Sequence, residues 1–219
     1  MSLREINKEK RRAAILQAAK DLFREKGGQQ ASAERIAKRA GVSTATLYNL
    51  VGKREELLSD LFNEIATEFK ERMDAVHEPD PILRTEAAIR LSIEIRLRDP
   101  EVSRVIFGEL SQQGADRIRD RMNPQPIELQ FTAMRSARAH GQLTDDADPL
   151  TLARQIWNSH NGAFQGWMGG MVDQATVIRQ SLHGFWTVIA AYGNDTEQQR
   201  AREKLRELVE PGQMPDAAD

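Results

Sequence analysis

The stretch that most constrains this chain is Ala40–Tyr48, where a helix end, a glycine corner and the start of a second helix follow one another closely. Gly41 supplies the left-handed conformation that ends a helix, and the Ser43 hydroxyl suits the free N–H groups at the start of the next one. Ser32 can cap the first helix, whose apolar positions recur at helical spacing. The pattern predicts two short helices joined by a tight corner, as in a helix-turn-helix.

The helix after Ser43 is expected to turn Leu47 toward the core and to leave its small residues outside. The outward positions are Thr44, Ala45, Thr46 and Tyr48. In a helix-turn-helix the first turn of the second helix meets base edges in the major groove, where bulky side chains would hold the backbone away. Any two helices joined at a steep angle can share such a corner, so the motif alone leaves DNA binding open.

The distribution of charge favours DNA binding. Residues 1–54 contain 13 Lys and Arg against 5 Asp and Glu, while residues 55–219 contain 18 against 28, so a basic head precedes an acidic body. A local excess of cations attracts phosphate groups and releases counterions from nucleic acid. The cations Lys8, Lys10, Arg11 and Arg12 fall at the start of the helix that precedes the corner, so two independent signals coincide.

The helix before the corner carries an apolar stripe and ends at Gly27–Gly28. Its stripe consists of Ile15, Leu16, Ala18, Ala19, Leu22 and Phe23. Since a three-helix unit buries little apolar surface, it is expected to pack on a fourth helix, from about Arg54 to His77. Apolar residues recur along that helix every three or four positions, at Leu57, Leu58, Leu61, Phe62, Ile65, Phe69 and Met73.

Many positions between Ala13 and Leu58 fit one known pattern. They are Ile15, Ala18, Leu22, Phe23, Gly27, Ile36, Ala37, Ala40, Gly41, Val42, Ser43, Thr46, Leu47, Tyr48 and Glu55–Leu57. With these residues the segment resembles the tetracycline-repressor-type (TetR) family of bacterial transcription regulators. The resemblance implies an all-α fold with an N-terminal three-helix reading domain and a larger helical bundle that dimerises and binds a small effector.

The resemblance also implies which residues touch DNA. Thr44, Ala45 and Tyr48 fall where family members contact bases, and Thr46 and Arg54 fall where they contact phosphate. Together with the basic cluster and the helix caps, the candidate DNA contacts are Lys10, Arg11, Arg12, Ser32, Arg35, Ser43, Thr44, Ala45, Thr46, Tyr48, Asn49 and Arg54.

The chain departs from the family pattern in the corner helices. Leu50 stands where many members have an aromatic residue or His, and Val51 where Phe is common. Glu34–Arg35 reverses the usual basic-then-acidic order, which makes Arg35 the DNA-facing cation. We expect the DNA specificity to differ accordingly.

Length divides the 219 residues into a DNA-binding domain, residues 1–54, and an effector-binding and dimerisation domain, residues 55–219. The absence of Cys excludes disulfides. With no secretion signal and no apolar run of about 18 residues, we expect a cytoplasmic protein without a membrane anchor. Residues 87–97 alternate as a half-buried strand would, but no second segment could pair with such a strand, so a helix is expected.

Toward the C-terminus, Trp157, His160, Phe164, Trp167 and Met171 recur on one face of a helix that begins near Pro149. Glycines at 162, 166 and 169 lie on the opposite side, and a further helix is expected over about residues 173–192. By the resemblance, the helices near 149–169 and 173–192 pair across a two-fold axis in a homodimer.

The aromatic face has two interpretations. Aromatic residues at helical spacing pack in a core or a dimer interface, or they line a pocket for an apolar effector. In the second case the candidate ligand-binding residues are Phe62, Phe69, Trp157, His160 and Phe164. The four scattered His give no metal-ligand spacing, so neither a metal nor another cofactor is expected.

Catalytic motifs are absent from the sequence, since it has no phosphate-binding glycine loop, nucleophile elbow or zinc-binding helix motif. We therefore expect no enzyme but a ligand-responsive transcription regulator, a homodimeric repressor of a palindromic operator released by an unidentified small molecule. The alternative is a helical carrier of small molecules whose DNA-binding head has degenerated, as Leu50 and the reversed Glu34–Arg35 would allow.

Overall fold

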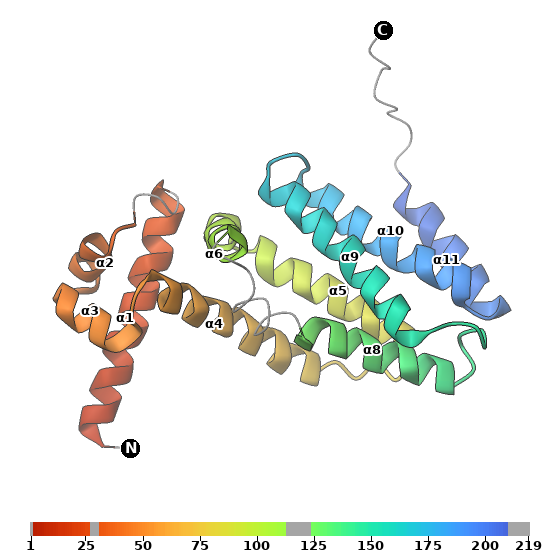
Figure 1. The fold of residues 1–219 in the computed structure, drawn as a ribbon, viewed down its shortest axis with the longest axis horizontal. Coiled ribbons are helices and arrows are strands. Elements are labelled where there is room, and N and C mark those ends of the chain that lie inside the picture. The colour runs from red at the N-terminus through yellow and green to blue at the C-terminus, as the bar shows by residue number, and fades with distance from the viewer. Residues whose placement is uncertain (1, 27–30, 113–123, 210–219) are drawn as a thin grey trace, which may run out of the picture. The chain divides into compact units, whose positions relative to one another are not determined.

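The computed structural model describes residues 2–26, 31–112 and 124–209, and over these ranges the chain is helical (Figure 1). The helices are α1 (Leu3–Lys26), α2 (Ala33–Ala40), α3 (Thr44–Val51), α4 (Arg54–Asp74), α5 (Pro81–Leu97), α6 (Pro100–Gln112), α8 (Pro124–Ala139), α9 (Pro149–Met168), α10 (Gln174–Tyr192) and α11 (Asp195–Leu208). The predicted all-α fold is confirmed. None of the helices in these ranges has the length and apolar character needed to span a bilayer.

The described chain forms two compact units. Unit 1 contains residues 2–75 and 94–112, and unit 2 contains residues 76–93 and 124–209. In unit 1, α4 and α6 pack with the first three helices, while α8, α9, α10 and α11 form most of unit 2. The predicted boundary after residue 54 separates a DNA-binding domain from an effector-binding and dimerisation domain, and it stays a prediction.

The core of unit 1 is built on the predicted apolar stripe of α1. All six of its residues are buried, and they pack with Ile36, Leu47, Leu57 and Leu58 from the three following helices. The three-residue and four-residue spacing that the sequence shows is therefore the spacing of one buried helix face. Within the fourth helix, Phe62, Ile65 and Phe69 are only half-buried.

The segment with strand-like alternation is helical, as predicted. Along α5, Ile89, Leu91, Ile93 and Ile95 are all buried, although residues two apart lie on different sides of a helix. A helix with apolar residues on two sides has neighbours on both, so the alternation reflects two packed faces and no strand.

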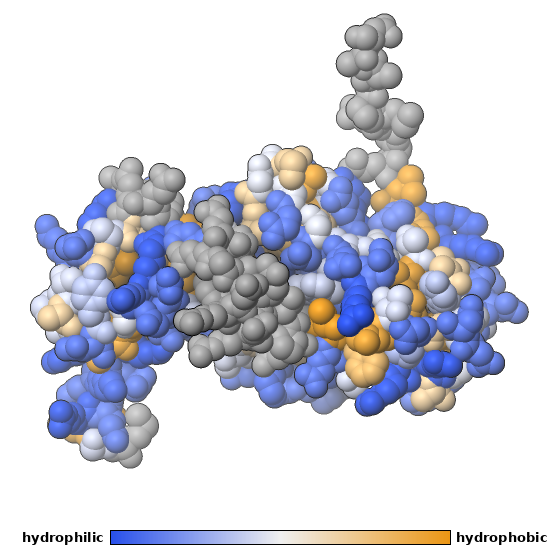
Figure 2. Space-filling model, viewed as in Figure 1, coloured by the Kyte–Doolittle hydropathy of each residue, from blue (hydrophilic) through white to orange (hydrophobic). Residues whose placement is uncertain are grey.

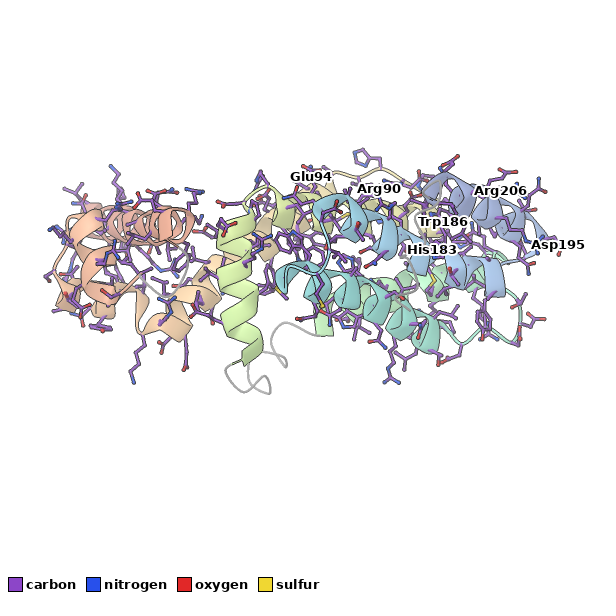
Figure 3. All side chains as sticks on the ribbon, turned by 90° about the horizontal axis from the view of Figure 1, so that it is seen from above. Arg90, Glu94, His183, Trp186, Asp195 and Arg206 are labelled. Atoms are coloured by element: carbon purple, nitrogen blue, oxygen red, sulfur yellow. The ribbon has the colours of Figure 1, made fainter. Side chains whose placement is uncertain are left out.

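Unit 2 has an aromatic interior contributed by α9 and α10. Trp167, Phe185 and Trp186 are essentially inaccessible to solvent, whereas His183 lies on the exposed side of α10, as Figure 3 shows. Met171 does not continue the aromatic face, because α9 ends at Met168 and Met171 is 76% exposed beyond it. The sequence repeat extended one step further than the helix did.

A carboxylate at the start of α5 ties three elements of unit 2 together. Asp80 accepts hydrogen bonds from the backbone N–H of Ile82 (2.9 Å), from Gln142 Nε2 (3.1 Å) and from Arg200 Nη1 of α11 (2.8 Å). Burial alone would raise the pKa of Asp80, but these hydrogen bonds outweigh it and lower the pKa. The ionised form is therefore the one that the fold stabilises.

Asp80→Asn is expected to lower the free energy of unfolding by about 1–3 kcal/mol near pH 7, because a charge-assisted bond to Arg200 is lost. A carboxyl with a depressed pKa stabilises the fold above its unfolded pKa of about 3.9, and this contribution disappears as the pH falls through the folded pKa. Urea denaturation of the variant and the parent should therefore converge in acid. The exposed Asp146→Asn is the control, and a difference that persists in acid would contradict the assignment.

Candidate nucleic-acid interface

The predicted corner between α2 and α3 is present with its caps. Gly41 has a φ of 68°, the left-handed conformation that ends α2, and the N–H of Val42 donates to the carbonyl of Ala37. Ser32 Oγ accepts a hydrogen bond from the N–H of Arg35 (3.4 Å), and Ser43 Oγ accepts one from the N–H of Thr46 (3.1 Å). Both helix starts are thus fixed by the serines that the sequence singles out.

The side chains of α3 divide into an inner and an outer set. Leu47 is 3% exposed and Val51 is buried, whereas Tyr48 is 48% exposed and Ala45 and Asn49 are also exposed. The small Ala45 and the ring of Tyr48 lie on the outer side of a short helix whose backbone is held by Leu47. An outer face of this kind can enter a DNA major groove without rearrangement.

Three of the predicted polar contacts already have roles within the protein. Ser43 Oγ lies 2.8 Å from Thr46 Oγ1 in addition to capping α3, so both hydroxyls belong to the corner. The Arg12 guanidinium pairs with Asp60 of α4 at 2.5 Å. Their contacts with DNA remain predictions, and the same atoms would have to serve both purposes.

Arg54 is the residue whose surroundings differ most from the expectation. Its guanidinium makes a bidentate ion pair with Glu109 of α6, with both N–O distances 2.6 Å, and donates to the Ala31 carbonyl at 2.8 Å. It also lies 5.6 Å from the centre of the Phe23 ring. Arg54 therefore links three elements, namely α1, the residue before the Ser32 cap of α2, and α6. A DNA phosphate would have to compete with this network for the guanidinium group.

The remaining basic candidates lie at the surface. Lys10 and Arg11 are exposed on α1, and Arg35 is half-buried on α2. Arg39, which the sequence analysis did not select, is held by Glu25 of α1 through two hydrogen bonds of 2.5 and 3.1 Å. A cation that is held by a carboxylate contributes less to binding phosphate than an exposed cation does.

A groove of about 800 Å³ opens beside α3. Its walls include the starts of α2 and α4, at Ser32 and Lys53, and the ring of Tyr48. The N–H groups of Arg35 and Lys53 at these helix starts already donate to Ser32 Oγ and to the Glu56 side chain, which also lines the groove. At these two starts the exposed Lys53 side chain is therefore the group that can attract an anion. The sequence analysis did not select Lys53. The N–H of Lys53 donates to the Glu56 side chain (2.7 Å) at the start of α4, and the three-residue spacing of these two residues is the corresponding signal in the sequence.

The candidate ligand-binding residues are divided between the two units. Phe62 and Phe69 belong to unit 1, where the Phe62 ring packs edge-to-face on Phe107 at 5.8 Å. Trp157, His160 and Phe164 belong to α9 in unit 2. The ligand pocket that these five residues were expected to line stays a prediction.

His160 lies in the interior of unit 2. Its ring nitrogens lie 3.1 Å from Ser92 Oγ and 3.1 Å from Ser181 Oγ, and the ring centre is 5.0 Å from that of Phe164. The imidazole therefore joins α5, α9 and α10 through hydroxyl groups. This arrangement satisfies a buried polar side chain in the manner of a structural histidine.

Comparison with known proteins finds a family match in the N-terminal part of the chain. Residues 15–61 match the family model described as bacterial regulatory proteins, tetR family. Among the relatives are the nucleoid occlusion factor SlmA of Aliivibrio fischeri, 27% identical over 190 residues that cover 84% of this chain and 96% of SlmA, and that of Vibrio campbellii, 29% identical over 71% and 83%.

Solved structures share the fold of the chain. SmeT, the repressor of the Stenotrophomonas maltophilia multidrug efflux pump SmeDEF, superposes with a TM-score of 0.66 at 24% identity and covers 95% of this chain and 97% of its own. NalD, the secondary repressor of the MexAB-OprM pump in Pseudomonas aeruginosa, gives 0.62 at 23% identity, with 86% and 98% covered. At these identities the likeness concerns the fold alone.

Proposed function

We propose that this chain, whose residues 15–61 match the tetR family model, is a homodimeric transcriptional repressor. In this proposal, α3 of each protomer lies in the major groove of a palindromic operator, and the protein leaves the DNA when a small molecule binds unit 2. The observation that carries the proposal is the division of α3 into a buried Leu47 and an exposed face with Ala45, Tyr48 and Asn49. The base contacts of that face are worth about 1–3 kcal/mol each.

Two copies are needed for a physical reason. One short helix reads only a few base pairs, so useful specificity requires two half-sites held about 34 Å apart. We propose α9 and α10 as the dimer contact, because Ile178 and Tyr192 of α10 are each more than a third exposed and Gly162 of α9 has open space beside it. Light scattering after gel filtration should give twice the 24.7 kDa chain mass, and a monomer at assay concentration would refute this arrangement.

The proposed effector acts by differential binding. A small molecule that prefers the conformation with mismatched half-site spacing needs a coupling of only about 1–3 kcal/mol to vacate DNA over a useful concentration range. The aromatic residues Trp157 and Phe164 beside His160 are our candidates for its surroundings.

The first test measures DNA binding directly. Fluorescence anisotropy with a labelled random-sequence duplex should show an affinity that falls steeply with salt, because the basic head releases counterions from phosphate. A flat response would favour the carrier alternative, in which the head no longer binds DNA.

A second candidate function follows from the SlmA relatives. The similarity to SlmA of Aliivibrio fischeri covers 84% of this chain and so reaches beyond residues 15–61, and a role as a nucleoid occlusion factor therefore merits a test. Genome-wide occupancy distinguishes the two functions. A repressor should occupy a few promoter-proximal operators, whereas sites scattered over the chromosome away from promoters would favour nucleoid occlusion.

A further inference from the structure

α1 is much longer than α2 and α3, which pack against it. It has 24 residues against eight each in α2 and α3, so it spans about 36 Å against about 12 Å. Residues 3–11 are exposed at every position, whereas the buried stripe begins only at Ile15. In Figure 1 this first part of α1 continues past α3 to the N-terminus, and Figure 2 shows it as a hydrophilic projection.

The projecting part of α1 carries cations on one side of the helix. C-terminal to it, from Ile15 onward, the same side faces the core of unit 1. Arg4, Lys8 and Arg11 are spaced by four and three residues. Ile15, which has no exposed surface, follows Arg11 at a spacing of four. Residues at this spacing lie on one face of a helix. The core-facing side therefore changes from apolar to cationic where the other helices no longer cover it.

The direction of this stripe is fixed by ion pairs on either flank. Lys20 bonds to Glu64, which places α4 on one flank of α1, and Glu25 bonds to Arg39, which places α2 on the other. Helical periodicity puts Arg4, Lys8 and Arg11 between the two flanks. They face the same side of α1 as the corner helices do.

The cationic stripe is unopposed. The carboxylates of this segment, Glu5 and Glu9, lie on the row that continues to Arg12 and hence toward α4, and Glu5 accepts a hydrogen bond from the N–H of Ser2. Within the described ranges of the chain, Arg4, Lys8 and Arg11 make no ion pair with a carboxylate. Three exposed cations with no internal partner are therefore held on one rigid face.

We infer that Arg4, Lys8 and Arg11 form a second DNA-binding surface, which contacts phosphates beside the base pairs that α3 reads. The inference rests on the proposed DNA-binding function. The three side chains span about 10 Å along the helix axis, and duplex DNA carries one negative charge per about 1.7 Å, so several phosphates fall within their reach. These contacts add affinity and position the head without reading sequence.

Lys8→Ala and Lys70→Ala provide a matched test. Both residues are exposed lysines of unit 1, but Lys70 lies on α4 and belongs to none of the candidate DNA contacts. Anisotropy with a random duplex of about 30 base pairs, enough for two half-sites, gives the slope of log K against log salt. Because a homodimer carries each substitution twice, Lys8→Ala should reduce the steepness of that slope by about 1.8 and the triple variant Arg4→Ala/Lys8→Ala/Arg11→Ala by about 5.4. Lys70→Ala should leave it unchanged.

The outcomes separate the two claims. A native chain without salt-dependent binding would overturn the proposed function itself. A steep native slope that Lys8→Ala and Lys70→Ala change equally, or that the triple variant leaves intact, would overturn only the second surface and indicate a solvated face. Circular dichroism of each variant should show unchanged helix content, because alanine favours helix at least as well as lysine or arginine does.

Discussion

Leu47→Ala is expected to lower the free energy of unfolding of unit 1 by about 2–5 kcal/mol, the cost of removing a buried leucine and leaving a cavity. Leu47 is 3% exposed and is one of only two buried residues of α3. Because α3 has eight residues and depends on packing for its stability, we expect the substitution to destabilise unit 1, which contains α3. Urea denaturation followed by circular dichroism measures it, and DNA binding should fail in parallel.

Tyr48→Ala, at the next position, is expected to weaken DNA binding while leaving the stability of unit 1 nearly unchanged. Its ring is about half exposed, so removing it should change stability by only about 0.5 kcal/mol. Operator affinity should nevertheless fall by about 1–3 kcal/mol, because we propose that this exposed ring contacts the bases. Equal losses of stability in the two variants would contradict the inward and outward assignment of these residues, on which the proposed function depends.

Local sequence patterns predicted the corner between α2 and α3 well, because its geometry depends on residues that are close together in the sequence. The caps at Ser32 and Ser43, the corner at Gly41 and the inward Leu47 involve residues only a few positions apart, so spacing in the sequence determines their geometry. Helix periodicity likewise identified the buried face of α1 before any contact was known. The family resemblance added the order of the helices.

Long-range pairs lay beyond such reasoning. Arg54 and Glu109 are 55 residues apart, and no periodicity links a cation at the start of α4 with a carboxylate on α6. The pair between Arg12 and Asp60 has the same origin. Both arginines appear in the sequence as exposed members of a basic head, and only the packed helices reveal that carboxylates hold them.

The glycines of the body show the same distinction between pattern and packing. The clustering of Gly162, Gly166 and Gly169 in the sequence suggests either close approach of another helix or room for a ligand. An added Cβ would meet nothing within 4 Å at Gly162 and only ordinary neighbours at Gly166. The tight position is Gly184 of α10, which the sequence analysis did not select. There a Cβ would lie 2.4 Å from Ser159 Cβ of α9.

Gly184→Ala is therefore expected to destabilise unit 2, although alanine favours helix over glycine by about 1 kcal/mol. The clash involves the Cβ of Ser159, which cannot move without its backbone, so overpacking should cost about 1–3 kcal/mol and exceed the gain in helix propensity. Thermal or urea denaturation of the variant measures the balance, and a rise in stability would mean that α9 and α10 are further apart than the described contact.

The double variant Gly184→Ala/Ser159→Gly tests whether that one contact is responsible. Ser159→Gly removes the atom that the new methyl group would meet, at the cost of a flexible residue inside α9. If the clash sets the loss, the two substitutions should be coupled by about 1–3 kcal/mol in the stabilising direction, and the double variant should recover most of what Gly184→Ala loses. Strictly additive effects would mean that the loss arises elsewhere. The close contact of α9 and α10 would then have no part in holding together the two helices through which we propose the dimer forms.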